Sequence, residues 1–408
     1  IADLSPDRAK ANLRYCGWDE ARIEAPSLDE AARSGATCVT DDTAALIRHP
    51  AVEVIIEATG DPAHGIRHCL EIIRQGKHVV MVNVEADVVA GPLLAQRARE
   101  AGVVYSLAYG DQPALVCEHV DWARTCGFEV VCAGKGTRYH PSFHASTPET
   151  VWGHYGMDPE TAARGRLNPK MFNSFLDGTK SGIEMAAICN ATGLHAQPDG
   201  LGFPPSSAQD LAKVCKPRSA GGTLALAGTT EVVSSLDRDL TPVPNHIQFG
   251  TYVVVAAGHD YVRWCAEEYH ITRDENGDFI ALYRPTHWIG LELGVSVASV
   301  ALRGEPTGAP FCFNADVAAT AKRDLKAGEM LDGEGGYCVW GKQVPSEVSL
   351  REGYLPLGLA SHVKLVADVP AGRQLRWSDV AIDESDPTVR FRREMEARFG
   401  GAAPRTAS

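Results

Sequence analysis

The first third of the chain alternates between short apolar segments and segments with helical spacing. Segments 51–59, 78–87 and 103–113 are typical of buried strands that end in polar residues, whereas 64–75 and 91–101 have the periodicity of helices. Strands and helices that alternate with short connections form parallel sheets covered by helices. The pattern therefore predicts an α/β fold that begins with a doubly wound parallel, Rossmann-like sheet.

The ends of these predicted strands carry the polar residues. In open parallel sheets the carboxyl ends of the strands lie along one edge, and ligands bind outside that edge. We therefore expect a nicotinamide nucleotide, NAD or NADP, to bind there. The residues expected to contact it are Thr59, Gly60, Asn83, Glu85, Gly110 and Asp111.

The first residues fit the end of another strand of the same unit. Ile1, Ala2 and Asp3 resemble a strand terminus, and Ser5-Pro6 fits the cap and first position of a helix. An acidic residue at such a strand end hydrogen-bonds the adenosine ribose and favours NAD over NADP, so Asp3 is a cofactor-binding candidate. The alternative is a solvated turn residue. The glycine-rich fingerprint expected about 20 residues earlier is not in the sequence.

Length, charge and cysteine content narrow the class of protein. A chain of 408 residues predicts two or three domains. The formal net charge is −13, and the basic residues do not cluster, which argues against nucleic acid as a partner. No apolar run approaches the roughly 20 residues that span a bilayer, so we expect no membrane partner. Eleven scattered cysteines without a CxxC pair are typical of reduced thiols and predict a cytoplasmic protein.

A second domain is expected from residue 113 onward. Residues 128–133 read as a strand followed by Gly134-Lys135-Gly136. Between two glycines at a strand end, Lys135 has little local structure to bury it, so it can project into a cleft as a catalytic residue. The alternative interpretation is a surface lysine in a turn.

Residues 175–194 form a mostly apolar segment that we interpret as one helix with charges on it. Lys180 and Glu184 are four residues apart and would share a helix face, so we expect them to form a catalytic pair, or else a structural ion pair. Asp177 either caps the helix or takes part in catalysis. Asn190 either contacts substrate or satisfies a neighbouring backbone group.

Two residues in the segment YRPTHW are further candidates for substrate binding. Arg284 would suit a phosphate or carboxylate through its bidentate guanidinium, and His287 lies beside Trp288. No metal site is expected. The spacing of Glu85 and Asp87 would place both on one face of a strand, but on its own this is a weak indication of a divalent-ion site.

The last part of the chain differs in character. Segments 319–337 and 363–382 share a strand, a charged residue and the phrase Ala-Gly-x-x-Leu. These half-repeats resemble the SAF domain, a small β-rich module. We therefore expect a dinucleotide-binding domain over 1–112, an α+β catalytic domain over 113–310 with its last helix returning to the first domain, a SAF-like domain over 311–386, and a charged tail over 387–408. The tail is expected to begin with a surface helix and to end in a disordered segment.

The order of these motifs resembles a known family. VNVEAD, YGDQP, AGKG, the 175–194 segment, YRPTHW and the half-repeats follow one another as in homoserine-dehydrogenase-like oxidoreductases with a C-terminal SAF domain. Within that group the chain is similar to the deoxyxylulose-phosphate-reductoisomerase-like branch. The resemblance implies a nicotinamide cofactor, a small-molecule substrate and a homo-oligomer, a dimer by analogy. One member of the branch converts 1-deoxyxylulose 5-phosphate to 2-C-methylerythritol 4-phosphate.

Two residues depart from the family pattern. Homoserine dehydrogenases place a lysine after the asparagine of the VTANK-like strand, and Val84 at this position argues against homoserine as substrate. Asp3 favours NAD, whereas the reductoisomerase reaction uses NADPH.

Two functions are consistent with these observations. The first is an NAD(P)-dependent oxidoreductase that acts on a small polyol, sugar acid or sugar phosphate, with reductoisomerase chemistry as one form of it. In this interpretation Lys135 and Lys180 hold the reacting oxygens, and Glu184 orients or exchanges protons. The alternative is a nucleotide-sensing or carbohydrate-binding protein that uses the SAF module for recognition.

Overall fold

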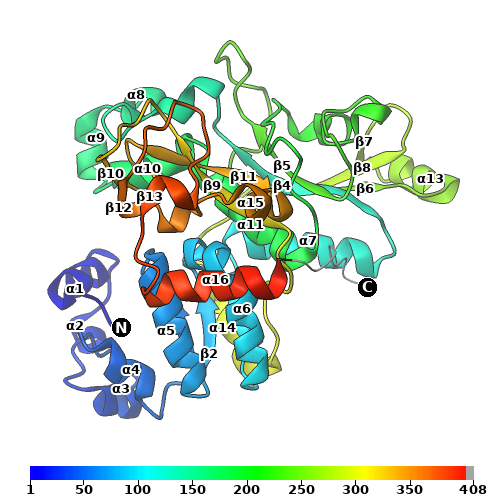
Figure 1. Cartoon of the computed structure of the whole chain (residues 1–408). Helices are drawn as coiled ribbons and strands as arrows, with labels where there is room; N and C mark the ends of the chain where they lie inside the picture. The colour runs from blue at the N-terminus through cyan, green and yellow to red at the C-terminus, as the bar shows by residue number, and fades with distance from the viewer. Residues whose placement is uncertain (401–408) are drawn as a thin grey trace.

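The computed structural model describes residues 1–400 and begins with a group of short helices (Figure 1). The helix predicted after Ser5-Pro6 is present, and Ala2 forms a parallel bridge with Thr40. This group lies to one side of the first sheet (Figure 1). Its helices are α1 (Pro6–Tyr15), α2 (Glu20–Ile23), α3 (Leu28–Ser34) and α4 (Thr43–Arg48).

The predicted parallel sheet follows, with its three strands in sequence order. They are β1 (Val54–Glu57), β2 (His78–Met81) and β3 (Tyr105–Leu107). Val79 pairs with Ile55 on one side and with Tyr105 on the other. The connections are α5 (Pro62–Arg74) and α6 (Val84–Glu100), and α7 (Gln112–Thr125) leads away from β3.

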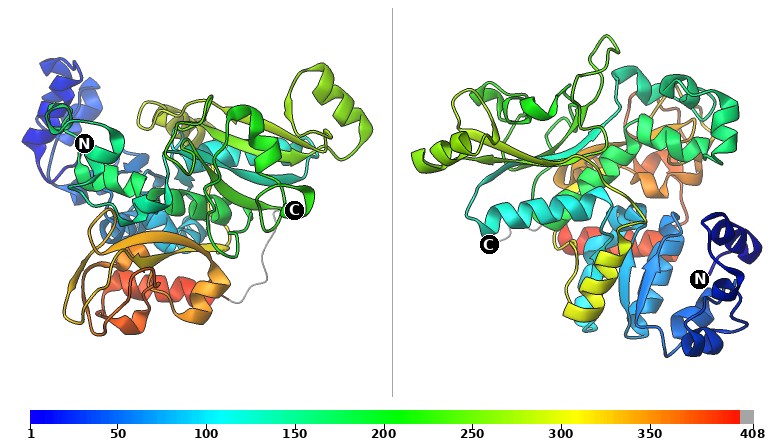
Figure 2. Two further views of the ribbon diagram at one scale, coloured as in Figure 1. Left: turned by 90° about the horizontal axis from the view of Figure 1, so that it is seen from above. Right: turned by 180° about the vertical axis from the view of Figure 1, so that it is seen from behind.

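Side chains of β2 point alternately to two packed faces. Val79 and Met81 pack in one apolar cluster with residues of α5 and α6. Val80 lies in a different cluster with Ala108 and Val300. Val300 belongs to the π-helical turn that follows α14 (Leu293–Ala298), and Figure 2 shows this returning segment against the sheet. Helical segments therefore cover both faces of β2, as is typical of parallel sheets, whereas Ile56 of β1 is exposed.

The segment VNVEAD is a helix start and not a strand end. Asn83 caps α6 by accepting a hydrogen bond from the backbone N–H of Ala86 at 3.1 Å. Glu85 and Asp87 therefore lie in the first turn of α6. The expectation that they share one face of a strand is wrong, because residues two apart on a helix point in different directions.

The second domain is built on a mixed five-stranded sheet. Its strand order is β5 (Thr229–Ser234), β4 (Val130–Thr137), β6 (Thr251–Ala256), β8 (Phe279–Arg284) and β7 (Thr272–Arg273). Only the β4–β5 pair is parallel. Strand β4 continues through Gly134-Lys135-Gly136 to Thr137, so the predicted end of the strand before Gly134 is wrong. Outlying helices of this domain are α8 (Val151–Tyr155), α9 (Pro159–Arg164), α12 (Leu211–Val214) and α13 (Asp260–Glu268).

The 175–194 segment is two elements and not one helix. Helix α10 (Pro169–Leu176) ends at Asp177, Gly178 takes a left-handed conformation with φ +93°, and α11 (Thr179–Thr192) begins after it. Helix α11 contacts α6, α7 and the strands of two domains, and lies at the centre of the molecule. Gly182 allows this approach, because a Cβ there would lie 2.7 Å from the carbonyl oxygen of Gly341.

The last part of the chain is a small β-rich unit. It contains β9 (Ala315–Ala321) paired with β11 (Val339–Pro345), and β12 (Ser361–Leu365) between β10 (Met330–Asp332) and β13 (Val380–Ala381), all antiparallel. Helix α15 (Ser346–Glu352) follows β11.

The helix predicted after residue 386 is present, but it is packed against the protein and is not a surface helix. Residues Pro387–Phe399 form α16, which packs on α6 and α5. Arg392 and Met395 are fully buried there. Residues 401–408 lie outside the described part. Within residues 1–400, no helix combines the length and the apolar character needed to cross a membrane.

Candidate active site

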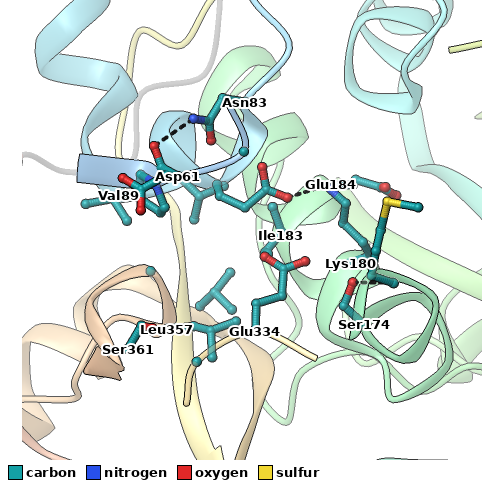
Figure 3. Close-up of a pocket in the computed structure, with 18 of the residues that line it drawn as sticks. Asp61, Asn83, Val89, Ser174, Lys180, Ile183, Glu184, Glu334, Leu357 and Ser361 are labelled. Carbon is teal, nitrogen blue, oxygen red and sulfur yellow. Dashed lines mark hydrogen bonds and ion pairs between the residues drawn. The ribbon is translucent and has the colours of Figure 1, made fainter. Parts of the chain in front are cut away.

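All three parts of the chain line one large cleft. Its volume is about 1470 Å³, which exceeds the ~300–1,000 Å³ of pockets for drug-sized ligands. The ends of β1 and β2, the catalytic domain and the C-terminal unit all contribute to its wall. Figure 3 shows the central part of this wall, where charged side chains of different domains point into a common space. The cleft therefore has room for a dinucleotide and a small substrate together.

Lys135 reaches the cleft from the middle of β4. The flanking residues are glycine because the sheet leaves no space for side chains. A Cβ at Gly134 would lie 1.9 Å from the carbonyl oxygen of Glu231, and one at Gly136 would lie 2.0 Å from that of Ile247. Lys135 itself is only 5% exposed and forms an ion pair with Glu184 of α11. The interpretation of Lys135 as a surface lysine is therefore wrong.

Lys180 pairs with a residue of the nucleotide-binding domain. Its ammonium group contacts the carboxylate of Glu85 at the start of α6. The expected pair within α11, between Lys180 and Glu184, is replaced by two pairs that join α11 to two different elements. The lysine-before-glutamate order is unfavourable for a pair within a helix, whereas each residue finds a well-placed partner elsewhere.

The pKa of Lys180 follows from these surroundings. Burial by itself lowers the pKa of the ammonium group, and nearby carboxylates raise it by more, so the pKa lies above its ordinary value. These carboxylates belong to Glu85, Glu334, Asp111 and Glu184. Lys180 therefore remains a cation at any physiological pH.

Asp111 is held at the edge of the same charged group. It caps α7 by accepting a hydrogen bond from the backbone N–H of Gln112 at 2.8 Å. Burial, and then the charge of Glu184, raise the pKa of Asp111 to about 7. A carboxyl group with such a pKa can gain or lose a proton near neutral pH.

Glu334 is a cleft residue that the sequence analysis did not identify. It lies in the loop between β10 and β11, and its carboxylate points toward the same space as Lys180 (Figure 3). Burial, and then the charge of Glu85, raise the pKa of Glu334 to about 7. One sequence feature could have identified Glu334: it is a charged residue between two glycines, Gly333 and Gly335, as Lys135 is between Gly134 and Gly136.

Asp177 and Asn190 do not line the cleft. Asp177 accepts a hydrogen bond from the N–H of Thr179 at 2.9 Å and forms a buried ion pair with Lys322 at 2.7 Å. Asn190 exchanges hydrogen bonds with the backbone of Ala315, at 3.0 Å as acceptor and 3.1 Å as donor. These contacts are those expected of structural residues: the Asp177 carboxylate binds the first backbone N–H of α11, and Asn190 joins α11 to β9.

The two candidates of YRPTHW lie in different surroundings. Arg284 pairs with Glu292 and is not part of the cleft wall. The expectation that it binds substrate there is not supported by its position. His287 does line the cleft, and its ring nitrogens contact Gln112 at 2.9 Å and the carbonyl oxygen of Phe249 at 2.7 Å.

Some of the predicted cofactor-binding residues line the cleft, and others lie outside it. Thr59, Gly60 and Asn83 lie in the cleft wall with Glu85 and Asp111. Asn83 donates to the Thr59 hydroxyl at 3.2 Å, which joins the ends of the two strands. A Cβ at Gly60 would meet nothing within 4 Å, so the space beside this strand end is open.

Asp3 and Gly110 lie outside the described cleft wall. The Asp3 carboxylate accepts a hydrogen bond from the N–H of Ser5 at 2.7 Å and lies 3.5 Å from the guanidinium of Arg8. Within residues 1–400 no cluster of three His, Cys, Asp or Glu side chains could hold a metal ion.

Two family models match most of the chain between them. Residues 4–107 match the NAD-binding domain of homoserine dehydrogenase, and residues 110–293 match the catalytic domain of the oxidoreductase DRL. The protein is an oxidoreductase. The cleft of this oxidoreductase lies where the two matched domains meet, and the first of them makes a nicotinamide nucleotide its cofactor.

Solved structures give only distant likenesses to this oxidoreductase. An oxidoreductase from Bacillus cereus is 14% identical, with 70% of this chain and 81% of that chain covered and a TM-score of 0.28. The 1-deoxy-D-xylulose 5-phosphate reductoisomerase of Zymomonas mobilis, in complex with NADPH, is 20% identical, with coverages of 41% and 43% and a TM-score of 0.25. A Bacillus subtilis chain is 21% identical, with a TM-score of 0.19, and the match spans 29% of this chain and 35% of that one. No curated protein matches.

Proposed function

We propose that this oxidoreductase interconverts a carbonyl and an alcohol group on a small polyol, sugar acid or sugar phosphate. The observation that supports this most is the pair of buried lysine–carboxylate contacts, Lys135–Glu184 and Lys180–Glu85, that face one cleft. The second contact joins the catalytic domain to the helix that follows a strand end of the NAD-binding domain.

The chemistry of these groups suits a reacting oxygen. An alkoxide that develops from a carbonyl is stabilised by fixed positive charge in a site that excludes water. Lys180 is held as a cation, and Lys135 is anchored by Glu184 in a rigid strand. Neighbouring carboxylates accept hydrogen bonds from hydroxyl groups. A substrate with several adjacent oxygens would therefore find both donors and acceptors in this cleft.

The residues present fit a nicotinamide nucleotide. The open space beside Gly60 and the joined strand ends at Thr59 and Asn83 lie in the cleft wall, at the edge where parallel sheets bind nucleotides. When bound, the nicotinamide supplies or accepts the hydride. The protein's part is to orient the substrate oxygen between the two lysines and to keep water away.

Two further cations in the cleft support an acidic or phosphorylated substrate. Arg138 and Lys170 both lie in its wall. Arg138 donates to the carbonyl oxygen of His154 at 3.1 Å, and Lys170 to that of Asp332 at 2.6 Å. Within residues 1–400 neither has a carboxylate within ion-pair distance, so both charges are available to an anionic group.

Reductoisomerase chemistry is the finer form of this proposal. A rearrangement before hydride transfer needs proton exchange at two neighbouring oxygens of the substrate. The cleft offers two carboxyl groups, Asp111 and Glu334, with a pKa of about 7. 1-Deoxyxylulose 5-phosphate is therefore the first substrate to assay.

The test is oxidation of NADH and NADPH by the full natural chain with 1-deoxyxylulose 5-phosphate, other ketoses and keto sugar acids. We expect Lys180→Met and Lys135→Met to lower kcat by roughly 100-fold or more, because each removes a fixed charge beside the reacting oxygen. Lys364→Met is the matched control, since Lys364 is exposed and outside the cleft wall.

Two results would contradict the proposal. Full activity in Lys180→Met would show that the charge pairs are structural. Tight cofactor binding without turnover of any substrate would favour a nucleotide-sensing or carbohydrate-binding role instead.

A further inference from the structure

The C-terminal unit places one acidic side chain in the cleft. Glu334 stands between Gly333 and Gly335 in the loop that joins β10 to β11. Gly333 has a left-handed backbone, with φ +71°, and Gly335 has φ +65°. These conformations, which side chains with a Cβ rarely adopt, turn the loop sharply so that the residue between them projects.

The loop is fastened to the catalytic domain on both sides of Glu334. Before Glu334, the ammonium of Lys170 donates to the carbonyl oxygen of Asp332 at 2.6 Å, and after it the Nδ2 of Asn173 donates to that of Gly335 at 2.9 Å. The backbones touch so closely that a Cβ at Gly335 would lie 2.0 Å from the carbonyl oxygen of Lys170. Glu334 is therefore as rigidly placed as a residue on a helix or strand.

Charged groups from three elements surround the Glu334 carboxyl. Glu85 of α6 and Asp177 disfavour its ionised form, and Lys180 of α11 favours it. The hydroxyl of Ser174 in α10 supports the ionised form through a hydrogen bond. Desolvation is the largest influence, and the net result is a pKa of about 7.

A pKa near neutral suits Glu334 for proton exchange with a substrate. A general acid or base works best when its pKa is near the working pH. Lys180 fails this condition because its pKa is raised well above neutral. Asp111 also has a pKa of about 7, but one of its oxygens is engaged in capping α7.

We propose that Glu334 is a catalytic residue that exchanges a proton with the substrate oxygen, so that the C-terminal unit completes the active site. This inference rests on the proposed carbonyl–alcohol chemistry. In the oxidation direction the substrate O–H bond breaks and its proton passes to the Glu334 carboxylate. The oxygen electron pair forms the C=O bond while the hydride leaves the carbon for the oxidised nicotinamide. Reduction reverses each change.

The first test needs no substrate. Infrared difference spectra of protein with isotope-labelled glutamate carboxyls are recorded across pH for the wild type and Glu334→Gln. We expect a protonated-carboxyl signal that disappears as the pH rises through about 7 in the wild type and is smaller in Glu334→Gln, where buried Glu231, whose pKa is also raised to about 7, supplies the part that remains. Glu347→Gln, which alters an exposed glutamate of the same unit, should keep the signal. If Glu334→Gln removes no signal that titrates near neutral pH, the proposal is wrong.

The second test is the pH profile of turnover in both directions. Wild-type reduction should fall as pH rises above about 7, because the acid form is needed, and oxidation should fall as pH drops below about 7. Glu334→Gln should lower kcat by about 100-fold in both directions. It should leave cofactor affinity unchanged, and Glu334→Asp should restore part of kcat.

The outcomes separate this inference from the proposed function. An active Glu334→Gln enzyme with an unchanged pH profile, beside an inactive Lys180→Met enzyme, would overturn the role of Glu334 and leave the proposed function standing. A wild-type protein that turns over none of the carbonyl substrates would overturn the proposed function, and the catalytic role of Glu334 with it. If Glu334→Gln has a lowered thermal midpoint, Glu334→Ala replaces it in both tests.

Discussion

Asp87 illustrates how burial, more than position in sequence, sets the behaviour of a residue here. It is fully buried in the first turn of α6, and the hydroxyl of Tyr105 donates to its Oδ1 at 2.6 Å. Among residues 1–400, its Oδ2 has no hydrogen-bond partner. Burial raises the pKa of Asp87 to about 7, although the Tyr105 hydrogen bond acts in the opposite direction. Asp87 is thus a buried structural carboxyl, while Glu85, two residues before it, faces the cleft.

This shift predicts a pH-dependent stability. An unfolded aspartate has a pKa of about 3.9, so between about pH 4 and 7 the folded protein binds a proton that the unfolded chain has lost. The protonated Asp87 therefore contributes fully to the free energy of unfolding below about pH 4, and this contribution is lost as the pH rises through about 7. Asp87→Asn should remove this part of the pH dependence of the free energy of unfolding.

We expect Asp87→Asn to be about as stable as the wild type at pH 4 and more stable at pH 8 by on the order of 2 kcal/mol. Urea unfolding at the two pH values measures the difference. Equal stability differences at both pH values would mean that Asp87 does not hold its proton in the folded protein.

Helix α16 shows the same principle at the scale of an element. Its sequence is rich in arginine and glutamate, which on its own is typical of a solvated surface helix. Arg392 is nevertheless fully buried, donating to both oxygens of Asp316 at 3.2 and 2.6 Å and to the carbonyl oxygen of Val89 at 3.2 Å. The helix therefore joins β9 of the C-terminal unit to α6 of the NAD-binding domain.

Arg392→Met should destabilise the protein by roughly 3–5 kcal/mol, because it leaves the buried Asp316 carboxylate without its cation. Arg390→Met in the same helix is the control, since Arg390 is exposed. Chemical unfolding of both variants gives the comparison. A loss of under 1 kcal/mol in Arg392→Met would show that the pair does not hold α16 in place.

At the scale of the whole molecule, the cleft exists only because the three parts of the chain pack around α11. Its wall includes the strand ends of the NAD-binding domain, Lys135 of the five-stranded sheet and Glu334 of the C-terminal unit. A bound cofactor should therefore stabilise the assembled protein, since the separate parts do not form the site.

The preference for NADH or NADPH can be measured on the whole molecule. If Asp3 contacts the adenosine ribose, NADH should raise the thermal midpoint more than NADPH does at equal concentration, because a carboxylate repels the 2′-phosphate. Arg8, 3.5 Å from Asp3, offsets part of that repulsion. Asp3→Asn should narrow the difference between the two midpoint shifts. An unchanged difference in this variant would place Asp3 away from the ribose.

The sequence alone determined the alternation of strands and helices in the first sheet and the presence of charged side chains near the site. The periodicity of residues 51–113 predicted the parallel sheet, because alternation of strand and helix is encoded by neighbouring residues. Lys180 was recognisable as a charge in an apolar segment, and Lys135 as a lysine between two glycines after a strand. The extent of β4 and the start of α6 could not be predicted from the sequence. Both Gly134-Lys135-Gly136 and the VNVEAD segment are compatible with more than one local structure.

The tertiary structure decided which charges meet. Lys180 finds Glu85, which is 95 residues away, in place of Glu184 on its own helix. Asp177 finds Lys322, and Asn190 finds the backbone of β9, so both have structural roles. Glu334 enters the cleft from a unit that local patterns did not connect with catalysis. The physical reason is that burial and long-range contacts determine the free energy of a charged group, and neither can be predicted from its neighbours in the sequence.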